Sequence, residues 1–350
     1  PNRGPTERWR PGETKRKCER QVTQPMEVMN ISDIPAIRLG NAQDLTAATG
    51  CTVILCPEGA TAGVDVRGGA PGTRETDLLK PENLVEKIHG LLLAGGSAYG
   101  LAAASGVMSY LEENGFGFDV GVARVPIVPA AVLFDLPCGD ARVRPDQAMG
   151  YQACRNSETE RFATGSVGAG CGATVGKLYG MDKAMKGGLG AHCVRIGGLV
   201  VGAVVAVNCL GDVIDPASGQ IVAGSVQQDP FRFLDSEAGL LQQCEATGNR
   251  FTGNTTIGAI ITNASLTKAQ ATKVASMAHD GYARTMRPAH TLLDGDTIFT
   301  LAVGDVAADI SAVGALAAKV MEQAVLSAVQ SATALAGFPC CRDVQQWRGK

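Results

Sequence analysis

Short apolar strands outnumber helices along this chain, and the two kinds of segment do not alternate regularly. Apolar and β-branched runs predict strands at 51–56, 61–66, 125–136, 256–262 and 297–303, with two more in 193–208 around a Gly-Gly pair. Apolar spacing predicts helices at 91–111, 265–286 and 310–336. A doubly wound parallel sheet needs strict alternation of strand and helix, so this order favours a layered α/β sandwich.

The chain divides into a tail and one large domain. Residues 1–30 hold seven lysines and arginines against four glutamates and few large apolar residues, which predicts a flexible basic tail. Residues 31–350 read as a single globular domain. Hydrophobic residues make up 45% of the chain and aromatic residues only 5%, while glycine occupies 44 positions. Small residues must therefore do much of the packing.

Charge and cysteine usage exclude several classes of protein. A net charge of −3 leaves no broad basic face for nucleic acid. The longest uncharged run, 90–111, is long enough to span a bilayer, but its glycines and serines predict a buried helix rather than a membrane anchor. Eleven cysteines without metal-type spacing, and no secretory hydrophobic segment near the N-terminus, predict reduced thiols in a cytoplasmic protein.

The tripeptide Asn254-Thr255-Thr256 has two interpretations. It matches an N-glycosylation acceptor, for which no export signal gives support. It also fits a self-cleavage site, where the Thr255 hydroxyl attacks the preceding carbonyl and Thr255 becomes a new N-terminus. The free α-amine then acts as the base for its own hydroxyl.

Two further clusters have a structural interpretation beside the functional one. The glycine-rich stretch 165–177 lacks the phosphate-loop spacing, and its Lys177 taken alone is more typical of a surface charge. His279, His290, Asp294 and Asp296 offer nitrogen and oxygen donors for a metal-dependent hydrolase, but an acidic turn before a strand explains them equally well.

Three ordered segments together resemble one family. They are 93–101 (LAGGSAYGL) followed by Gly106-Val107, 125–135 (VPIVPAAVLFD) and 253–263 (GNTTIGAIITN). Over about 31–336 the chain resembles the self-cleaving N-terminal-nucleophile hydrolases that include the aminopeptidase DmpA, the β-peptidyl aminopeptidases and the nylon-oligomer hydrolase NylC. The resemblance implies an α-β-β-α sandwich of the DmpA type.

The resemblance also implies roles for individual residues. Thr255 matches the nucleophile and Asn254–Thr255 the processed bond, which gives an α-chain 1–254 and a β-chain 255–350. Lys177 and Asn208 match residues that line the site, with Asn208 as the oxyanion donor. Asp294 and Asp296 match an acidic pair beside the nucleophile.

The branch within the family follows from the same positions. Thr255 with Asp294-Gly-Asp296 follows the nylon-oligomer branch, since the aminopeptidase branch has a Ser nucleophile with Ser and Glu. Phe134 stands where the nylon branch has a pocket tyrosine, while Tyr151 fits a tyrosine of the aminopeptidase branch. Phe134 and Tyr151 are therefore the expected substrate-pocket residues.

The expected function is hydrolysis of linear amides with a free amino end, such as 6-aminohexanoate oligomers, without metal or cofactor. Aminopeptidase or β-aminopeptidase activity on short peptides and amino-acid amides is the alternative within this chemistry. A metal-dependent hydrolase and a non-enzymatic assembly subunit are alternatives of other classes. The family precedent implies a homo-oligomer, a tetramer of αβ units, with no nucleic-acid or membrane partner.

Overall fold

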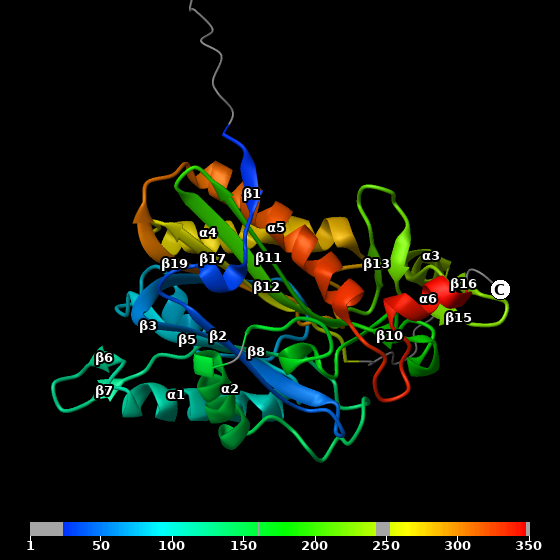
Figure 1. Ribbon diagram of the computed structural model, residues 1–350, viewed down its shortest axis with the longest axis horizontal. Coiled ribbons are helices and arrows are strands. Elements are labelled where there is room, and N and C mark those ends of the chain that lie inside the picture. Colours follow the sequence, from blue (N-terminus) through cyan, green and yellow to red (C-terminus); the bar gives the residue numbers. More distant parts are fainter. Residues whose placement is uncertain (1–23, 160, 243–252, 348–350) are drawn as a thin grey trace, which may run out of the picture.

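A ten-stranded mixed sheet runs through the protein, as seen in a computed structural model that describes residues 24–159, 161–242 and 253–347 (Figure 1). Nine of its strands follow one another in the order β1-β11-β12-β17-β19-β3-β5-β8-β4, and β2 pairs with β3 off this path. Their bounds are β1 Met26–Val28, β2 Arg38–Asp44, β3 Thr49–Val66, β4 Thr73–Arg74, β5 Lys87–Ala94, β8 Ala130–Val132, β11 Gly188–Ile196, β12 Leu199–Val207, β17 Ile257–Ala264 and β19 Thr297–Val306.

The long strand β3 belongs to two parts of this sheet. Its first half pairs with β2 and β5, and its second half pairs with β19. The pairing register between β3 and β5 shifts between Leu55 and Ala60. Such an irregularity bends the strand in which it occurs. The sheet is thereby divided into two stacked parts, one around β2, β3 and β5 and one around β11, β12, β17 and β19.

Helices cover the outer face of each part (Figure 1). Helices α4 (Lys268–Thr285) and α5 (Ile310–Ser331) pack on β11, β12, β3 and β19, whereas α1 (Ala103–Glu113) and α2 (Gln147–Thr159) pack on β2, β3 and β5. Three buried apolar clusters fill the three spaces between these four layers. Strand β17 shows the alternation, because Ile257, Ala259 and Ile261 face the central cluster while Ile260 faces the cluster under α4 and α5. The predicted α-β-β-α sandwich is confirmed.

Local sequence explains where the long helices begin. The Thr267 side chain accepts a hydrogen bond from the Gln270 N–H, and the Gln270 side chain caps the Thr267 N–H in return, which starts α4. At the start of α5, the Asp309 side chain accepts a hydrogen bond from the Ala312 N–H, without a reciprocal side-chain bond. Among the described helices, α5 alone has the length and apolarity to cross a membrane, but 61% of that stretch is buried inside the protein.

The remaining elements are short. The strands are β6 Phe118–Asp119, β7 Arg124–Val125, β9 Thr174–Val175, β10 Met185–Lys186, β13 Asp212–Ile214, β14 Ile221–Ala223, β15 Val226–Gln227, β16 Arg232–Phe233 and β18 Met286–Arg287. The helices are α3 Ser236–Gln242 and α6 Cys341–Trp347, with 3-10 turns η1 Ile31–Asp33, η2 Asp77–Leu79, η3 Ser97–Ala102, η4 Gly168–Gly170 and η5 Met181–Lys183.

Several predicted boundaries are wrong. The run 90–111 is not one helix, because residues 91–94 pair with β3 as part of β5 and Gly96 then turns the chain with φ +80° into η3 and α1. The strands predicted at 51–56 and 61–66 are the single strand β3, and within 125–136 only β8 and the end of β7 are strand. The predicted tail 1–30 ends too late, since β1 pairs with β11. Residues 1–23 lie outside the described part.

Candidate active site

Two sequence-distant segments meet at the start of a parallel strand pair. Thr255 lies two residues before β17 and the Asp294-Gly295-Asp296 turn directly precedes β19, and these two strands are parallel neighbours with Ile257 opposite Thr297. Asn254 also forms a bridge with Asp294, and the Thr297 N–H donates to the Thr256 carbonyl at 3.1 Å. The strand register therefore places the acidic turn beside Thr255.

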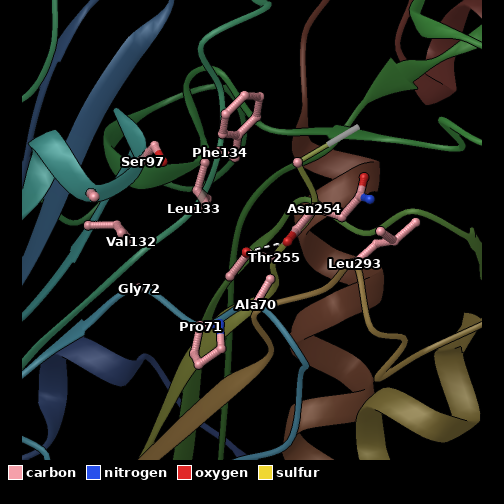
Figure 2. A pocket seen from close by; sticks show the side chains of 12 residues that line it. Ala70, Pro71, Gly72, Ser97, Val132, Leu133, Phe134, Asn254, Thr255 and Leu293 are labelled. Atoms are coloured by element: carbon pink, nitrogen blue, oxygen red, sulfur yellow. Dashed lines mark hydrogen bonds between the residues drawn. The ribbon is translucent and has the colours of Figure 1, made fainter. Parts of the chain in front are cut away.

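A cavity of about 130 Å³ opens at this point (Figure 2). Asn254, Thr255, Phe134 and Leu293 are among the residues that line it. The remaining lining residues belong to the segments 70–72, 97–98 and 132–133, and most of them have small side chains. Such a space suits a short substrate group held against Thr255.

The Thr255 hydroxyl faces the carbonyl that precedes it. Thr255 Oγ1 donates a hydrogen bond to Asn254 O, the contact drawn in Figure 2, and the Thr255 N–H donates to Asn208 O at 3.1 Å. Asn254 O also accepts from the Gly295 N–H at 3.1 Å. A backbone donor on this oxygen can stabilise the negative charge that develops when the hydroxyl attacks the carbonyl carbon.

Sequence reasoning missed Gly295 as a functional residue. A Cβ at this position would lie 2.7 Å from both Thr255 Oγ1 and the Ala70 carbonyl oxygen, so only glycine allows this approach. The sequence does carry a signal for it, because a glycine between two aspartates is typical of a point where another part of the chain approaches the backbone closely.

Lys177 is a buried residue of this site rather than a surface charge. Its Nζ donates to Asn208 Oδ1 at 2.9 Å, to Asn208 O at 3.0 Å and to Gly253 O at 3.5 Å. Burial lowers the pKa of Lys177 to about 8. An amine in this range exchanges protons near neutral pH, so Lys177 is suited to proton transfer beside the Asn254–Thr255 bond.

Asn208 links Lys177 to the cavity wall. Its Oδ1 accepts from Lys177 and from the Thr174 N–H at 3.0 Å, and its Nδ2 donates to Phe134 O at 3.1 Å. The oxyanion role expected for Asn208 stays a prediction. In this arrangement the donor on the Asn254 carbonyl is Gly295, while Asn208 holds Lys177 in place.

The two aspartates of the acidic pair have different partners. Asp294 Oδ2 accepts from the Thr291 N–H at 3.0 Å and from Thr291 Oγ1 at 2.5 Å, while Asp294 Oδ1 is buried without a hydrogen-bond partner among the described residues. Burial raises the pKa of Asp294 to about 6, and the neighbouring charge of Asp296 adds to the shift. Asp296 Oδ1 accepts from the Thr256 N–H at 2.8 Å. Asp296 therefore holds the segment that leads from Thr255 into β17, while Asp294 is buried behind the cavity lining with one carboxylate oxygen unpaired among the described residues.

The two expected pocket residues have different positions. Phe134 lines the cavity, and its ring would lie 2.0 Å from a Cβ at position 253, where glycine adopts φ +58°. Tyr151 lies on α2 and donates to Glu113 Oε2 at 2.6 Å, and it is not part of the cavity lining.

The histidines near the site have protein partners. His279 Nε2 lies 3.0 Å from Asp65 O, and His290 Nδ1 lies 2.9 Å from Asp296 Oδ2. Burial lowers the pKa of His279 to about 4. Within the described ranges, no three histidine, cysteine or acidic side chains are grouped to hold a metal ion.

Comparison with known proteins places this geometry in context. Residues 29–340 match the sequence profile of peptidase family S58. A Mycobacterium tuberculosis protein named an uncharacterized aminopeptidase is 45% identical over 343 residues, covering 90% of this chain and 97% of the relative. A 6-aminohexanoate-oligomer endohydrolase from a Kocuria species is 33% identical, covering 85% of each chain. The identities support the aminopeptidase alternative better than the nylon-oligomer reading.

The fold has solved counterparts. The L-aminopeptidase D-Ala-esterase/amidase of Ochrobactrum anthropi, described as a variant of the Ntn hydrolase fold, superposes with a TM-score of 0.66 at 17% identity, covering 93% of this chain and 97% of that one. This likeness shows that the sandwich described above is the DmpA-type Ntn hydrolase fold.

Proposed function

The chain belongs to peptidase family S58 and is a hydrolase of amide bonds, and from this premise we propose that it is a self-processing aminopeptidase with Thr255 as its nucleophile. Its substrates in this proposal are short peptides and amino-acid amides with a free amino end. The 45% identity to proteins named aminopeptidases supports this substrate class.

The observation that carries the proposal is the pair of contacts on the Asn254 carbonyl. Thr255 Oγ1 and the Gly295 N–H both donate to this oxygen. In the proposed maturation, Thr255 Oγ bonds to the Asn254 carbonyl carbon, and the bond to the Thr255 nitrogen breaks as that nitrogen gains a proton. Water then hydrolyses the ester, which leaves a carboxylate on Asn254 and a free α-amine on Thr255.

The mature site works by the same chemistry. An α-amine with an ordinary pKa near 7.7–8.0 accepts the proton of the Thr255 hydroxyl at neutral pH. Asp294 provides a buried carboxylate oxygen for the substrate ammonium, and the small cavity receives the acyl part. The Gly295 N–H, released from Asn254 by cleavage, is available for the substrate oxyanion.

Hydrolysis of aminohexanoate oligomers is the second candidate. It is favoured by the combination of a threonine with the Asp294-Gly-Asp296 turn and by the 33% identity to the oligomer endohydrolase. Both candidates share the nucleophile and differ in the length of the acyl group that enters the cavity.

Two measurements test the proposal. Intact mass of purified protein should show an α-chain ending at Asn254 and a β-chain beginning at Thr255; a fully active chain that is never cleaved would overturn it. Rates across amino-acid p-nitroanilides, β-peptides and aminohexanoate oligomers should be highest for the p-nitroanilides. A preference for the oligomers would instead select the second candidate.

A further inference from the structure

His290 is bonded twice to the carboxylate that holds the nucleophile strand. It lies between β18 and β19, and both its backbone N–H, at 3.0 Å, and its ring Nδ1, at 2.9 Å, contact Asp296 Oδ2. The other oxygen of Asp296 accepts from the Thr256 N–H at 2.8 Å. One side chain thus connects His290 to the residue directly after Thr255.

The backbone of His290 adopts an uncommon conformation to make this contact. Its φ is +57°, in the left-handed region that non-glycine residues adopt infrequently. Such conformations persist where the surrounding structure requires them. Here the surroundings direct the backbone N–H and the ring toward the same oxygen.

The ring environment determines which nitrogen donates. An ionised carboxylate only accepts hydrogen bonds, so Nδ1 carries the proton. On the other side, α4 presents His279 and Tyr282, with ring centroids 4.8 and 6.1 Å from that of His290. The side chain of His290 is 19% exposed, and its Nε2 is buried without a hydrogen-bond partner among the described residues.

We propose that His290 is a positioning residue for Thr255. By donating from two nitrogens to Asp296 Oδ2, it orients the carboxylate so that Oδ1 receives the Thr256 N–H. Thr255 is thereby held with its hydroxyl toward the Asn254 carbonyl before cleavage and toward the cavity after it. This inference rests on the proposed role of Thr255 as the nucleophile.

Two substitutions separate the side-chain donor from the backbone conformation. His290→Gly tolerates the left-handed backbone and removes the ring donor. His290→Asn also tolerates this backbone and keeps an amide N–H close to the position of Nδ1. Leu292→Gly is the matched control, because Leu292 is 87% exposed in the same loop.

The readouts are the rate of self-cleavage, followed by intact mass, and kcat and KM per mole of processed β-chain. We expect His290→Gly to lower both the cleavage rate and kcat by about tenfold to a hundredfold, the effect of a lost charge-assisted hydrogen bond, with little change in KM. His290→Asn should recover most of this loss, and Leu292→Gly should behave like the wild type.

A double-mutant cycle tests whether His290 acts through Asp296, with the folding of each variant checked by denaturant unfolding. If it does, His290→Gly and Asp296→Asn should combine with less than additive loss of the cleavage rate and of kcat. Wild-type rates in His290→Gly, or equal losses in the Gly and Asn variants, would overturn the positioning role. A wild-type chain that is not cleaved at Thr255 would instead reject the proposed function, so the two failures are distinguishable.

Discussion

At the scale of single residues, the hydroxyl of Thr255 serves both self-cleavage and turnover in the proposed chemistry. Thr255→Ala removes this hydroxyl, so we expect cleavage and turnover to disappear together. Thr255→Ser keeps a hydroxyl in the same place and should retain part of both. Intact mass and p-nitroanilide hydrolysis measure the two, and turnover that survives in Thr255→Ala would exclude this nucleophile.

Gly295 matters to the proposed cleavage because it has no side chain where Thr255 and the backbone of Ala70 approach it closely. Gly295→Ala would bring a methyl group 2.7 Å from Thr255 Oγ1 and from the Ala70 carbonyl oxygen. The turn must then shift, which moves the N–H donor away from Asn254 O. Loss of one oxyanion donor typically lowers kcat by about a hundredfold to a thousandfold, and we expect a cleavage defect of this order.

The matched control for that variant is Gly198→Ala. A Cβ at Gly198 meets nothing within 4 Å, and this glycine has no left-handed φ. Gly198→Ala should cleave at the wild-type rate. Equal cleavage in Gly295→Ala would show that the Gly295 N–H is not needed.

The raised pKa of Asp294 predicts that kcat/KM falls on the acid side of its pH profile. With a pKa near 6, raised mainly by burial, Asp294 is largely protonated below this pH and ionised above it. If the carboxylate binds the substrate ammonium, kcat/KM should fall as the pH is lowered through about 6. The profile of processed enzyme from about pH 5 to about 8 measures this limb.

Asp294→Asn checks the assignment of the limb. The amide cannot ionise, so kcat/KM of this variant should be low and should no longer change near pH 6. An unchanged limb in Asp294→Asn would assign it to another group. An α-amine ordinarily has a pKa of about 7.7–8.0, so the α-amine of processed Thr255 should give a separate limb.

At the scale of secondary-structure elements, the close approach of α4 to α5 depends on Gly281. A Cβ there would lie 2.6 Å from the Ala318 carbonyl oxygen and 2.9 Å from the Glu322 nitrogen. Alanine favours a helix over glycine by about 1 kcal/mol. The clash is with backbone, which cannot move without separating the helices, so the packing cost exceeds this gain.

We therefore expect Gly281→Ala to lower the free energy of unfolding by about 1–3 kcal/mol. Denaturant unfolding of the unprocessed Thr255→Ala chain measures this effect without interference from cleavage. Gly198→Ala in the same background is the control and should be nearly neutral. A more stable Gly281→Ala variant would mean that helix propensity outweighs the contact.

At the scale of the whole molecule, the expected homo-oligomer of αβ units stays a prediction. Its support is the set of exposed apolar side chains, including Val28 on β1, at the edge of the main sheet, and Leu45 and Leu241 elsewhere. Light scattering at micromolar concentration should give a mass of several αβ units, with four as the family precedent. A single αβ unit under these conditions would contradict the prediction.

The amino-acid sequence by itself determined the layered α/β class and the family, because these follow from local apolar patterns and from ordered motifs. It also indicated Thr255 and the Asp294-Gly-Asp296 turn, since each is a short contiguous signal. It misjudged 90–111, because local composition does not distinguish a buried strand from a buried helix.

Only the tertiary structure decided what surrounds Thr255. The Gly295 N–H donor, the burial of Lys177 and the two bonds from His290 to Asp296 depend on contacts between segments far apart in the chain. Burial also sets the pKa shifts of Lys177 and Asp294, and burial is a property of packing. The parallel pairing of β17 with β19 brings these groups together, and no local pattern in the sequence specifies that pairing.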